Sequence, residues 1–331
     1  MEAQLLRTFV AVARLGSFSA AAAELGYTQA AVSQQIAALE SDLKTQLLNR
    51  RPVSPTEAGT RLLEHAEPIL LRLDAARTDV TRMIRTPAAT LSVGATPLAG
   101  ATSVLAPALA ELGLRMPRLR ITVQTGTRKD IAMAVACGDL DLGLTDGLTA
   151  PGDPLPELVP LTAVGIGQAS VAVVLPVGHP LASRRALRLT DLADARWIEA
   201  DNAGLPLEEI RRHADTEGFR PAFRYTGSDV LTLIGLVSAG HGLALLPETV
   251  LPRAGIAAIP VSMPKVSHRL ELIHGTLWKS SPAALAATLV SSPARSRLFA
   301  TQGQLALRKG RKSGGLTTLT GPRCATILQE E

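Results

Sequence analysis

Apolar residues recur with helical spacing at the start of the chain and predict a first helix that ends at Gly16. They share one face, at Leu5, Phe9, Val12 and Ala13. The stretch 17–43 then reads as two short helices joined by a tight turn. We expect Ser19 to cap the first helix, Gly26 to end it in a left-handed conformation, and Thr28 to cap the second. This order predicts a helix-turn-helix.

The second of these helices has two contrasting faces. Its apolar residues fall within one narrow arc and are expected to face inward: Val32, Ile36, Leu39 and Leu43. The neighbouring arc carries small and amide side chains, namely Gln29, Ala30, Ser33, Gln34 and Ala37. Such a face fits a DNA major groove, where Gln bonds an adenine edge and Ser bonds several bases. An ordinary surface helix pair gives the same pattern, so these residues alone leave both interpretations open.

The segment after Leu48, NRRPVSP, has turn and strand character and predicts a two-stranded wing beside the helices. Arg50 and Arg51 on this wing are candidates for contacts with DNA phosphates. An ordinary loop with two solvated arginines is the alternative.

Thr56 is expected to cap a long helix over about 57–86, along which apolar residues alternate spacings of four and three. They form a heptad seam at Leu62, Ala66, Ile69, Leu73, Ala76, Val80 and Met83. A lone helix with such a seam needs a partner, so we expect a coiled-coil-like homodimer, with a kink at Pro68. Pairing of this helix places two helix-turn-helix units on one dyad-symmetric DNA site.

From Thr90 the pattern changes to short apolar strands that alternate with helices, which predicts parallel sheets. Strands are expected at 91–95, 120–125, 140–144, 170–176, 196–200, 243–247, 256–261 and 270–278. Helices are expected at 102–115, 128–139, 206–218, 228–242 and after Pro282. The fold class is therefore α/β, with an N-terminal all-α winged helix-turn-helix, a long linker helix and two Rossmann-like lobes. The lobes form a hinged clamp around a shared cleft, where small ligands bind in such sheets.

Composition locates the charge and limits the class of protein. The chain has 331 residues, 46% of them hydrophobic, which is enough for two or three domains with real cores. Its net charge of +5 does not come from residues 1–60, where five basic residues face five acidic ones. It comes from 295–331, and the basic tail 301–331 is expected to be disordered. Neither a signal peptide nor a membrane span is indicated, which predicts a cytoplasmic protein.

No motif for catalysis or metal binding stands out. The chain lacks a P-loop and the HExxH, GxSxG and paired CxxC motifs, so we predict no enzyme activity, cofactor or metal. Cys137 and Cys324 are far apart and predict no disulfide. Cys137 reads most simply as a small buried residue, with redox sensing as the alternative.

The segment LLRTFVAVARLGSFSAAAAELGYTQAAVSQQIAALESDLKTQLLNRRPVSPTEAG closely resembles the N-terminal winged helix-turn-helix of LysR-type transcriptional regulators. The matching positions are Leu6, Phe9, Gly16, Ser17, Phe18, Ala21, Ala22, Leu25, Gln29, Val32, Ser33, Gln35, Ile36, Leu39, Glu40, Leu43, Leu47, Arg50, Thr56, Ala58 and Gly59. The family usually has Phe in place of Leu48, Leu in place of Pro55 and a longer wing. VLPVGHPLA, GDLDLGL and VSAGHGLALLP are similar to the effector-binding domain of the same regulators, so the resemblance covers about residues 1–295.

The resemblance implies four segments. They are a DNA-binding domain (1–59), a linker helix (60–89), a two-lobed effector-binding domain of periplasmic-binding-protein type (90–300) and the tail (301–331). Lobe I would comprise about 90–162 and 266–300, and lobe II about 163–265. The implied partners are double-stranded DNA, a small-molecule effector, a second copy of the chain or a tetramer, and RNA polymerase if the protein activates transcription.

The resemblance also implies site residues. The expected DNA contacts are Ser19, Thr28, Gln29, Ala30, Ser33, Gln34, Arg50 and Arg51. The expected dimer contacts are Leu62, Ala66, Ile69, Leu73, Ala76 and Val80. The expected effector contacts are Thr96, Thr125, Thr127, Asn202 and Ser228, each of which taken alone reads more simply as a cap or turn residue. Two other classes remain open: a solute-binding receptor, against which the N-terminal 86 residues count, and an enzyme that uses the cleft.

Overall fold

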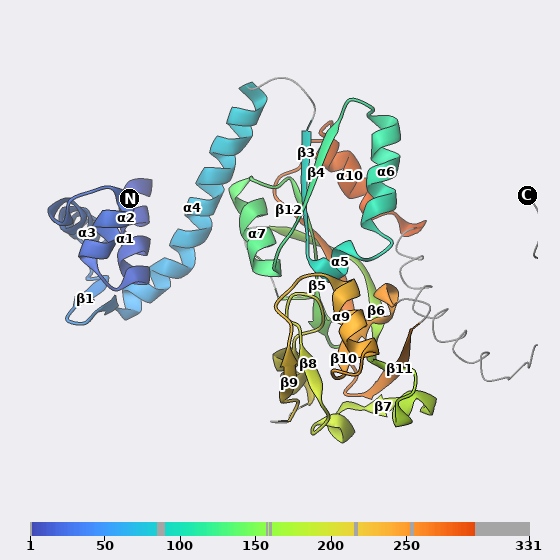
Figure 1. Ribbon diagram of the computed structural model, residues 1–331. Helices are drawn as coiled ribbons and strands as arrows, with labels where there is room; N and C mark the ends of the chain where they lie inside the picture. Colours follow the sequence, from blue (N-terminus) through green and yellow to red (C-terminus); the bar gives the residue numbers. More distant parts are fainter. Residues whose placement is uncertain are drawn as a thin grey trace, which may run out of the picture.

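The computed structural model of this chain describes residues 2–84, 90–156, 158, 161–214, 218–251 and 255–294. Figure 1 shows a small helical domain, one long helix that leads away from it, and a larger α/β body. The predicted tail 301–331, with Cys324, lies outside the described residues, and so do residues 85–89.

The N-terminal domain packs three helices and a hairpin against the start of the long helix. Its elements are α1 (Ala3–Leu15), α2 (Phe18–Leu25), α3 (Gln29–Leu43), β1 (Leu48–Arg50), β2 (Val53–Pro55) and α4 (Glu57–Ile84). Phe9 and Val12 of α1 and Ile36 of α3 are fully buried in one core. Gly16 and Gly26 end α1 and α2 with φ of 60° and 70°, the left-handed region that glycine enters without strain. The predicted helix-turn-helix and its wing are confirmed. Pro68 lies inside α4, which continues past it.

Lobe I is built on parallel strands, as the pattern predicts. Its elements are β3 (Thr90–Ala95), α5 (Pro97–Gly100), α6 (Leu105–Arg115), β4 (Arg120–Thr125), α7 (Arg128–Cys137), β5 (Leu142–Thr149), β12 (Ser267–His274) and α10 (Pro282–Val290). β3 pairs in parallel with both β4 and β5, while β12 runs antiparallel to β5. The helix expected from 102 begins only at Leu105, and the short α5 precedes it because Pro97 is suited to a first helical position.

Lobe II departs from the expected second parallel unit. Its elements are β6 (Thr162–Pro176), η1 (Pro180–Ser183), β7 (Leu187–Arg188), η2 (Leu189–Leu192), β8 (Trp197–Glu199), α8 (Leu207–Ala214), β9 (Pro221–Arg224), α9 (Val230–Ser238), β10 (Ala244–Pro247), η3 (Glu248–Val250) and β11 (Ile256–Met263). β10 and β11 both pair with β6 antiparallel, and parallel pairing is found between β8 and β9 and between β11 and β7.

One strand joins the two lobes. β6 is much longer than the expected 170–176, because its first half pairs with β12 of lobe I and its second half pairs with β10 and β11. The sheet order is β4-β3-β5-β12-β6-β11-β7, with β10 also on β6. Leu98 and Leu148 of lobe I pack into the core of lobe II, so the lobes touch through side chains as well. The ends of β3 and β5 and the start of α7 therefore face lobe II.

Candidate functional site

Capping hydrogen bonds fix where the two helices of the helix-turn-helix begin. The Thr28 hydroxyl accepts from the amide of Ala31 (3.2 Å), which confirms it as the cap of α3. Ser19 does not cap α2. The cap is Ser17, whose backbone is extended and whose hydroxyl accepts from the amide of Ala20 (3.2 Å), and Ser19 lies exposed in the first turn. A cap must stand just outside the helix, and α2 begins at Phe18.

The outward face of α3 carries the side chains that the sequence predicts. Val32, Ile36 and Leu39 are fully buried. Leu43 is not: it is 38% exposed, because it is the last residue of α3 and lies beyond the core. Gln29, Ala30, Gln34 and Ala37 are exposed and Ser33 is half-buried. Gln35 faces inward, where it accepts a hydrogen bond from the buried Thr8 hydroxyl on α1.

The wing is tied to α3 through one carboxylate. Oε1 of Glu40 accepts from the amides of Leu47 (2.9 Å) and Leu48 (3.2 Å), while its Oε2 lies 3.1 Å from Nη2 of Arg50. The Arg50 guanidinium also lies over the ring of Phe18, at 5.1 Å from its centroid. Arg51 is exposed at the turn of the hairpin. Arg50 is thus held by its own protomer, and Arg51 points into solvent.

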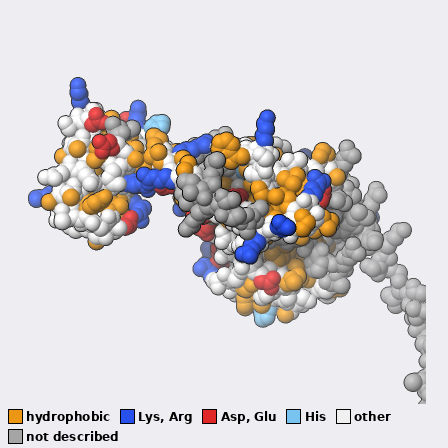
Figure 2. Space-filling view, turned by 90° about the horizontal axis from the view of Figure 1, so that it is seen from above, with side chains coloured by type: hydrophobic (Ala, Val, Ile, Leu, Met, Phe, Trp, Pro, Cys, Tyr) orange, Lys and Arg blue, Asp and Glu red, His pale blue; other side chains and the backbone are white. Residues whose placement is uncertain are grey.

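No single cationic patch covers the visible face of this domain. In Figure 2, Lys and Arg side chains are interspersed with Asp and Glu over the N-terminal domain, in agreement with the balance of charges in residues 1–60. Because the charges of residues 1–60 balance, we expect affinity for DNA phosphates to come from a few local contacts and not from net charge.

The predicted seam on α4 divides into two parts. Leu62 is half-buried and Ala66 is fully buried, both within the core of their own N-terminal domain, so Ala66 cannot reach a partner helix. Farther along, Ile69, Leu73, Ala76 and Val80 are exposed, and Val80 is 56% exposed. The side chain of Met83 lies outside the described residues. The apolar surface open to a partner runs from Ile69 to Val80.

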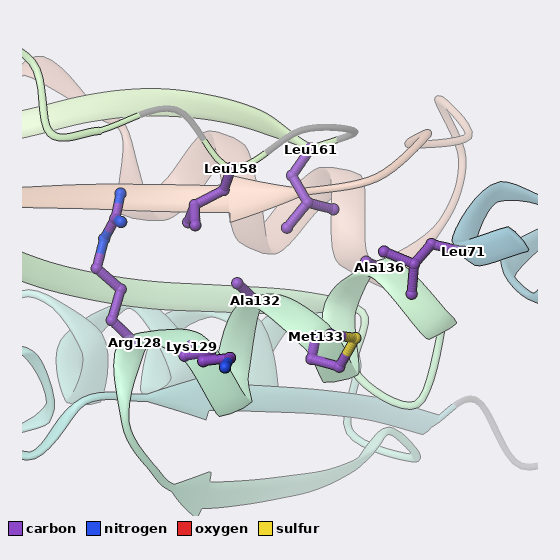
Figure 3. Close-up of a pocket in the computed structure, with 8 residues that line it drawn as sticks. All are labelled: Leu71, Arg128, Lys129, Ala132, Met133, Ala136, Leu158 and Leu161. Carbon is purple, nitrogen blue, oxygen red and sulfur yellow. The ribbon is translucent and has the colours of Figure 1, made fainter. Parts of the chain in front are cut away.

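The opposite side of α4 faces lobe I. Leu71 of α4, three apolar residues of α7 and two residues after β5 enclose a crevice of about 320 Å³, which we call the linker crevice. Figure 3 shows Leu71 at one end of it and Arg128 and Lys129 at the other. Its lining is Leu71, Arg128, Lys129, Ala132, Met133, Ala136, Leu158 and Leu161. At about 100° per residue, Leu71 lies roughly opposite the exposed seam, so α4 can pair with a second copy while it contacts α7.

A second pocket, of about 290 Å³, lies between the lobes. Lobe I contributes the ends of β3 and β5 and the start of α7, and lobe II contributes the loop after β8 and one face of α8. We call it the interlobe pocket. Its charged and amide side chains are Arg128, Asp146, Asp201, Asn202, Glu209, Arg212 and His213.

Three of the five expected effector residues line this pocket: Thr96, Thr127 and Asn202. The Thr96 hydroxyl donates to Asp146, and the Thr127 hydroxyl bonds Asp130 in a capping box that begins α7. Asn202 makes no side-chain hydrogen bond to another described residue. Thr125 and Ser228 are not brought to the pocket, and the cap of α9 is Asp229 instead, whose carboxylate accepts from the amide of Thr232 (2.9 Å).

Sequence reasoning missed a buried acid at the floor of the interlobe pocket. Asp146 lies 2.7 Å from Nε2 of His268, which is fully buried. Burial pushes the pKa of Asp146 upward, but the charge and hydrogen bond of His268 and the Thr96 hydroxyl outweigh it, and the pKa is lowered. Asp146 and His268 are 122 residues apart, and the pattern of the chain does not show that β5 and β12 pair.

Sequence reasoning also missed Arg128, which lines both the interlobe pocket and the linker crevice. Its Nη2 donates to the carbonyl of Pro156 (2.8 Å) and lies 3.8 Å from Oε2 of the buried Glu271. Burial lowers the pKa of Arg128, and the carboxylates of Glu271 and Asp146 oppose that shift. The first residue of α7 therefore has contacts at both sites.

Cys137 has the features of a structural thiol. It is partly buried at the end of α7, and burial, followed by the charges of Asp139 and Asp74, raises its pKa. A raised pKa disfavours the reactive thiolate. Within the described ranges, no group of three or more His, Cys, Asp or Glu residues is arranged to hold a metal ion. The helices described here include none with the length and apolar character needed to cross a membrane.

Two family models match the chain. The model of the bacterial regulatory helix-turn-helix protein, lysR family, matches residues 3–60, and that of the LysR substrate binding domain matches 85–287. A relative from Mycobacterium avium, named "Probable hydrogen peroxide-inducible genes activator", is 30% identical over 275 residues, which are 81% of this chain and 86% of that protein. The transcriptional dual regulator GltC of Bacillus subtilis is 28% identical over 291 residues, 86% of this chain and 94% of that protein.

Solved structures share the fold. Full-length BenM superposes with a TM-score of 0.50 at 24% identity, over 88% of this chain and 95% of that one. HinK, a LysR family transcriptional regulator from Pseudomonas aeruginosa, also gives 0.50, at 19% identity, over 91% and 99%. The chain belongs to the LysR family of transcription regulators, which join a helix-turn-helix DNA-binding domain to an effector-binding domain.

Proposed function

We propose that this protein acts as a homodimer, or as a tetramer built from such dimers, that reads a dyad-symmetric DNA site with α3 and the wing. The observation that carries the proposal is the face of α3. Gln29, Ala30 and Gln34 are exposed at its amino-terminal half, while its apolar side holds it on the domain core. The amino-terminal residues of a recognition helix are the ones that meet base edges in a major groove. Arg51, with Thr28 at the helix start, supplies the contacts to phosphate.

The interlobe pocket is the proposed effector site. It is concave, lies where strand ends and a helix start converge, and mixes apolar walls with a few polar groups. Thr96, Thr127 and Asn202 stay in the proposed site, and Thr125 and Ser228 do not. The domain that holds this pocket matches the LysR substrate binding domain, whose relatives are transcription regulators, so we propose binding without catalysis.

The route from effector to DNA is proposed to run through α7. Its first residue, Arg128, lines the interlobe pocket, and its Ala132, Met133 and Ala136 face Leu71 of α4 across the linker crevice. A ligand that moves the start of α7 thereby changes the support of the dimerisation helix. Coupling between two sites in one protein is usually worth about 1–3 kcal/mol. This coupling changes the spacing of the two α3 helices on the promoter. The changed spacing in turn alters the access or recruitment of RNA polymerase, in the bacterial cytoplasm.

Cys137 gives no support to peroxide sensing, which the name of the Mycobacterium avium relative suggests for that protein. Cys137 is partly buried and its thiol pKa is raised, the reverse of what a peroxide-reactive cysteine requires.

The test is a fluorescence anisotropy titration of the full chain against its own upstream intergenic DNA and against a shuffled duplex of equal length. The proposal predicts tighter binding to the upstream DNA, and affinity for both duplexes that falls steeply with salt. Equal affinity for both duplexes at every salt concentration would contradict site recognition.

A further inference from the structure

The interlobe pocket has acidic and basic side chains on walls that belong to different lobes. Asp201 and Glu209 stand on the lobe II wall, in the loop after β8 and on α8. Arg128 stands on the lobe I wall, at the start of α7. A ligand that fills the pocket therefore meets both signs of charge. Arg212 lies beside the two acids on the lobe II wall, and Asp146 lies on the lobe I wall with Arg128.

The acids of lobe II are only partly compensated by the protein, because the charges of Arg224 and Arg211 act on Asp201 from beyond salt-bridge distance. Neither Asp201 nor Glu209 forms an ion pair with any residue of the described part of the chain. Burial, followed by the neighbouring charge of Glu199, raises the pKa of Asp201, whereas Glu199 has its own partner in Arg224 at 2.6 Å. By contrast, Asp146 on the lobe I side is already satisfied by His268 and Thr96. A cationic group of a ligand would therefore be stabilised by Asp201, whereas Asp146 already has its hydrogen-bond partners.

Glu209 has partial compensation from its own helix. Arg212 and His213 lie three and four residues further along α8, and both line the same pocket. Side chains at these spacings share one helix face, and the guanidinium of Arg212 lowers the effective charge of Glu209. Asp201 is therefore the principal partner for a cationic group, with Glu209 beside it.

The lobe I wall suits an anion. Nε of Arg128 is buried and has no hydrogen-bond partner among the described residues. Its Nη2 donates to the carbonyl of Pro156 and lies 3.8 Å from Glu271, longer than a hydrogen bond. Arg128 begins α7, so the partial positive charge of the helix start adds to that of the guanidinium. Thr127 lines this wall but offers no free hydrogen-bond donor, because its hydroxyl is engaged in the cap.

A ligand of single charge fits this pocket poorly. A simple carboxylate would satisfy the lobe I wall but would bring a like charge towards Asp201, and a simple amine would be attracted to Asp201 and repelled by Arg128. This inference rests on the proposed role of the interlobe pocket as the effector site. We propose that the effector is a small zwitterion of the amino-acid type. Its carboxylate binds the Arg128 wall and its ammonium group binds the Asp201 wall.

Size and position set further limits on this ligand. A volume of about 290 Å³ is at the lower end for small-molecule sites and accommodates a single amino acid. Because the two charges of the ligand are held by different lobes, the ligand bridges them. The distance between its charged groups then sets how closely lobe I and lobe II approach each other.

The experiment uses the full-length chain and matched probes. The common L-amino acids are screened by thermal shift, and each one that binds is compared by calorimetry with its 2-hydroxy acid, which lacks the ammonium group, and with its decarboxylated amine. We expect at least one amino acid to bind and both truncated analogues to bind at least about tenfold more weakly. A screen in which no amino acid binds, or in which a hydroxy acid binds as well as its parent, overturns the inference.

Variants locate the two charges. Asp201→Asn is expected to weaken binding of the amino acid by at least about tenfold and to leave binding of the hydroxy acid unchanged or tighter. Arg128→Gln is expected to weaken binding of both ligands. Asp194→Asn, which removes an exposed acid of lobe II outside the pocket lining, is the matched control and should bind as the parent does. Unchanged binding of the amino acid to Asp201→Asn overturns the assignment.

The same proteins separate this inference from the proposed function. Suppose that a dicarboxylate or hydroxy acid binds, that its binding requires Arg128, and that it changes the affinity for DNA. The inference of a zwitterionic effector is then wrong, while the proposed regulator with an interlobe effector site is supported. If the chain shows no site-specific DNA binding at all, the proposed function fails whatever the ligand data show.

Discussion

At the scale of single residues, the contacts of a side chain on α3, and not its residue type, decide whether it faces inward or outward. Gln35 faces Thr8 inside the protein, while Gln29 and Gln34, which have the same amide, are exposed. Glu40 links α3 to the wing through two backbone amides and Arg50. The residues free to read DNA are therefore a subset of the polar residues on this helix.

Gln29→Ala and Ser33→Ala should weaken binding to the upstream site by about 1–3 kcal/mol and leave binding to random DNA nearly unchanged, because they remove contacts to bases. Arg50→Ala should weaken both, since it removes a cation and also loosens the wing on Glu40. Arg115→Ala on α6, an exposed arginine paired with Glu111, is the control. Equal losses on the two DNAs for Gln29→Ala would refute base reading at that position.

Glu248 predicts a pH dependence of stability. It is buried after β10, and burial raises its pKa from 4.5 to about 7. The folded state then holds a proton that the unfolded chain releases, so the free energy of unfolding falls as the pH rises from about 4.5 to about 7. We expect a loss of about 1–3 kcal/mol by urea denaturation, and a flatter profile for Glu248→Gln. The same pH slope in both proteins would exclude Glu248 as its source.

At the scale of elements, α4 has a different environment at each part of its surface. Its start packs on the wing, its middle faces α7, and its opposite side exposes Ile69, Leu73 and Val80. The periodicity of the sequence predicted the helix and its seam. The periodicity could not show that Ala66 is covered by its own domain, because a heptad pattern does not indicate which surface buries each apolar residue.

Leu73→Asp should convert the dimer to monomers in analytical ultracentrifugation, because it places a charge in the exposed seam. Thr60→Asp adds the same charge in the first turn of the same helix, outside the seam, where an acid is favourable. It should remain dimeric. An intact dimer for Leu73→Asp would move the interface to another surface.

Gly59 marks the contact between α4 and the wing. A Cβ at this position would lie 2.1 Å from the backbone oxygen of Leu47, and backbone cannot give way as a flexible side chain does. Gly59→Ala should therefore lower the free energy of unfolding by about 1–3 kcal/mol. Gly113→Ala on α6, where a Cβ would meet nothing, should instead gain up to about 1 kcal/mol. Similar effects of the two substitutions in thermal denaturation would contradict the close packing at Gly59.

The elements could be predicted more fully than the sites. Local patterns are sufficient for helices such as α3 and α7, whose caps and apolar spacing lie within a few residues. They are not sufficient for β6, because its first half has the composition of a loop and becomes a strand by pairing with β12. The interlobe pocket shows the same limit: Asp146 and His268 meet across strands, and Arg128 reads in the sequence as an ordinary basic residue at a helix start.

At the scale of the whole molecule, one helix connects the two functions. The start of α7 lines the pocket between the lobes, and its body supports α4, which leads to the DNA-binding domain (Figure 1). The opposite faces of α4 allow one copy to contact its own lobe I and a second copy at once. On the function we propose, this is the route by which a small ligand changes how two α3 helices are held.

A hydroxyl-radical footprint of the full-length chain on its upstream intergenic DNA tests the central claim most directly. Two copies of α3 held by a dimer predict two symmetric protected patches, with centres about 10–10.5 bp apart or a multiple of that, and both patches should vanish together for Leu73→Asp at concentrations where the parent binds. Protection that is absent, or that forms a single patch unaffected by Leu73→Asp, would contradict the account.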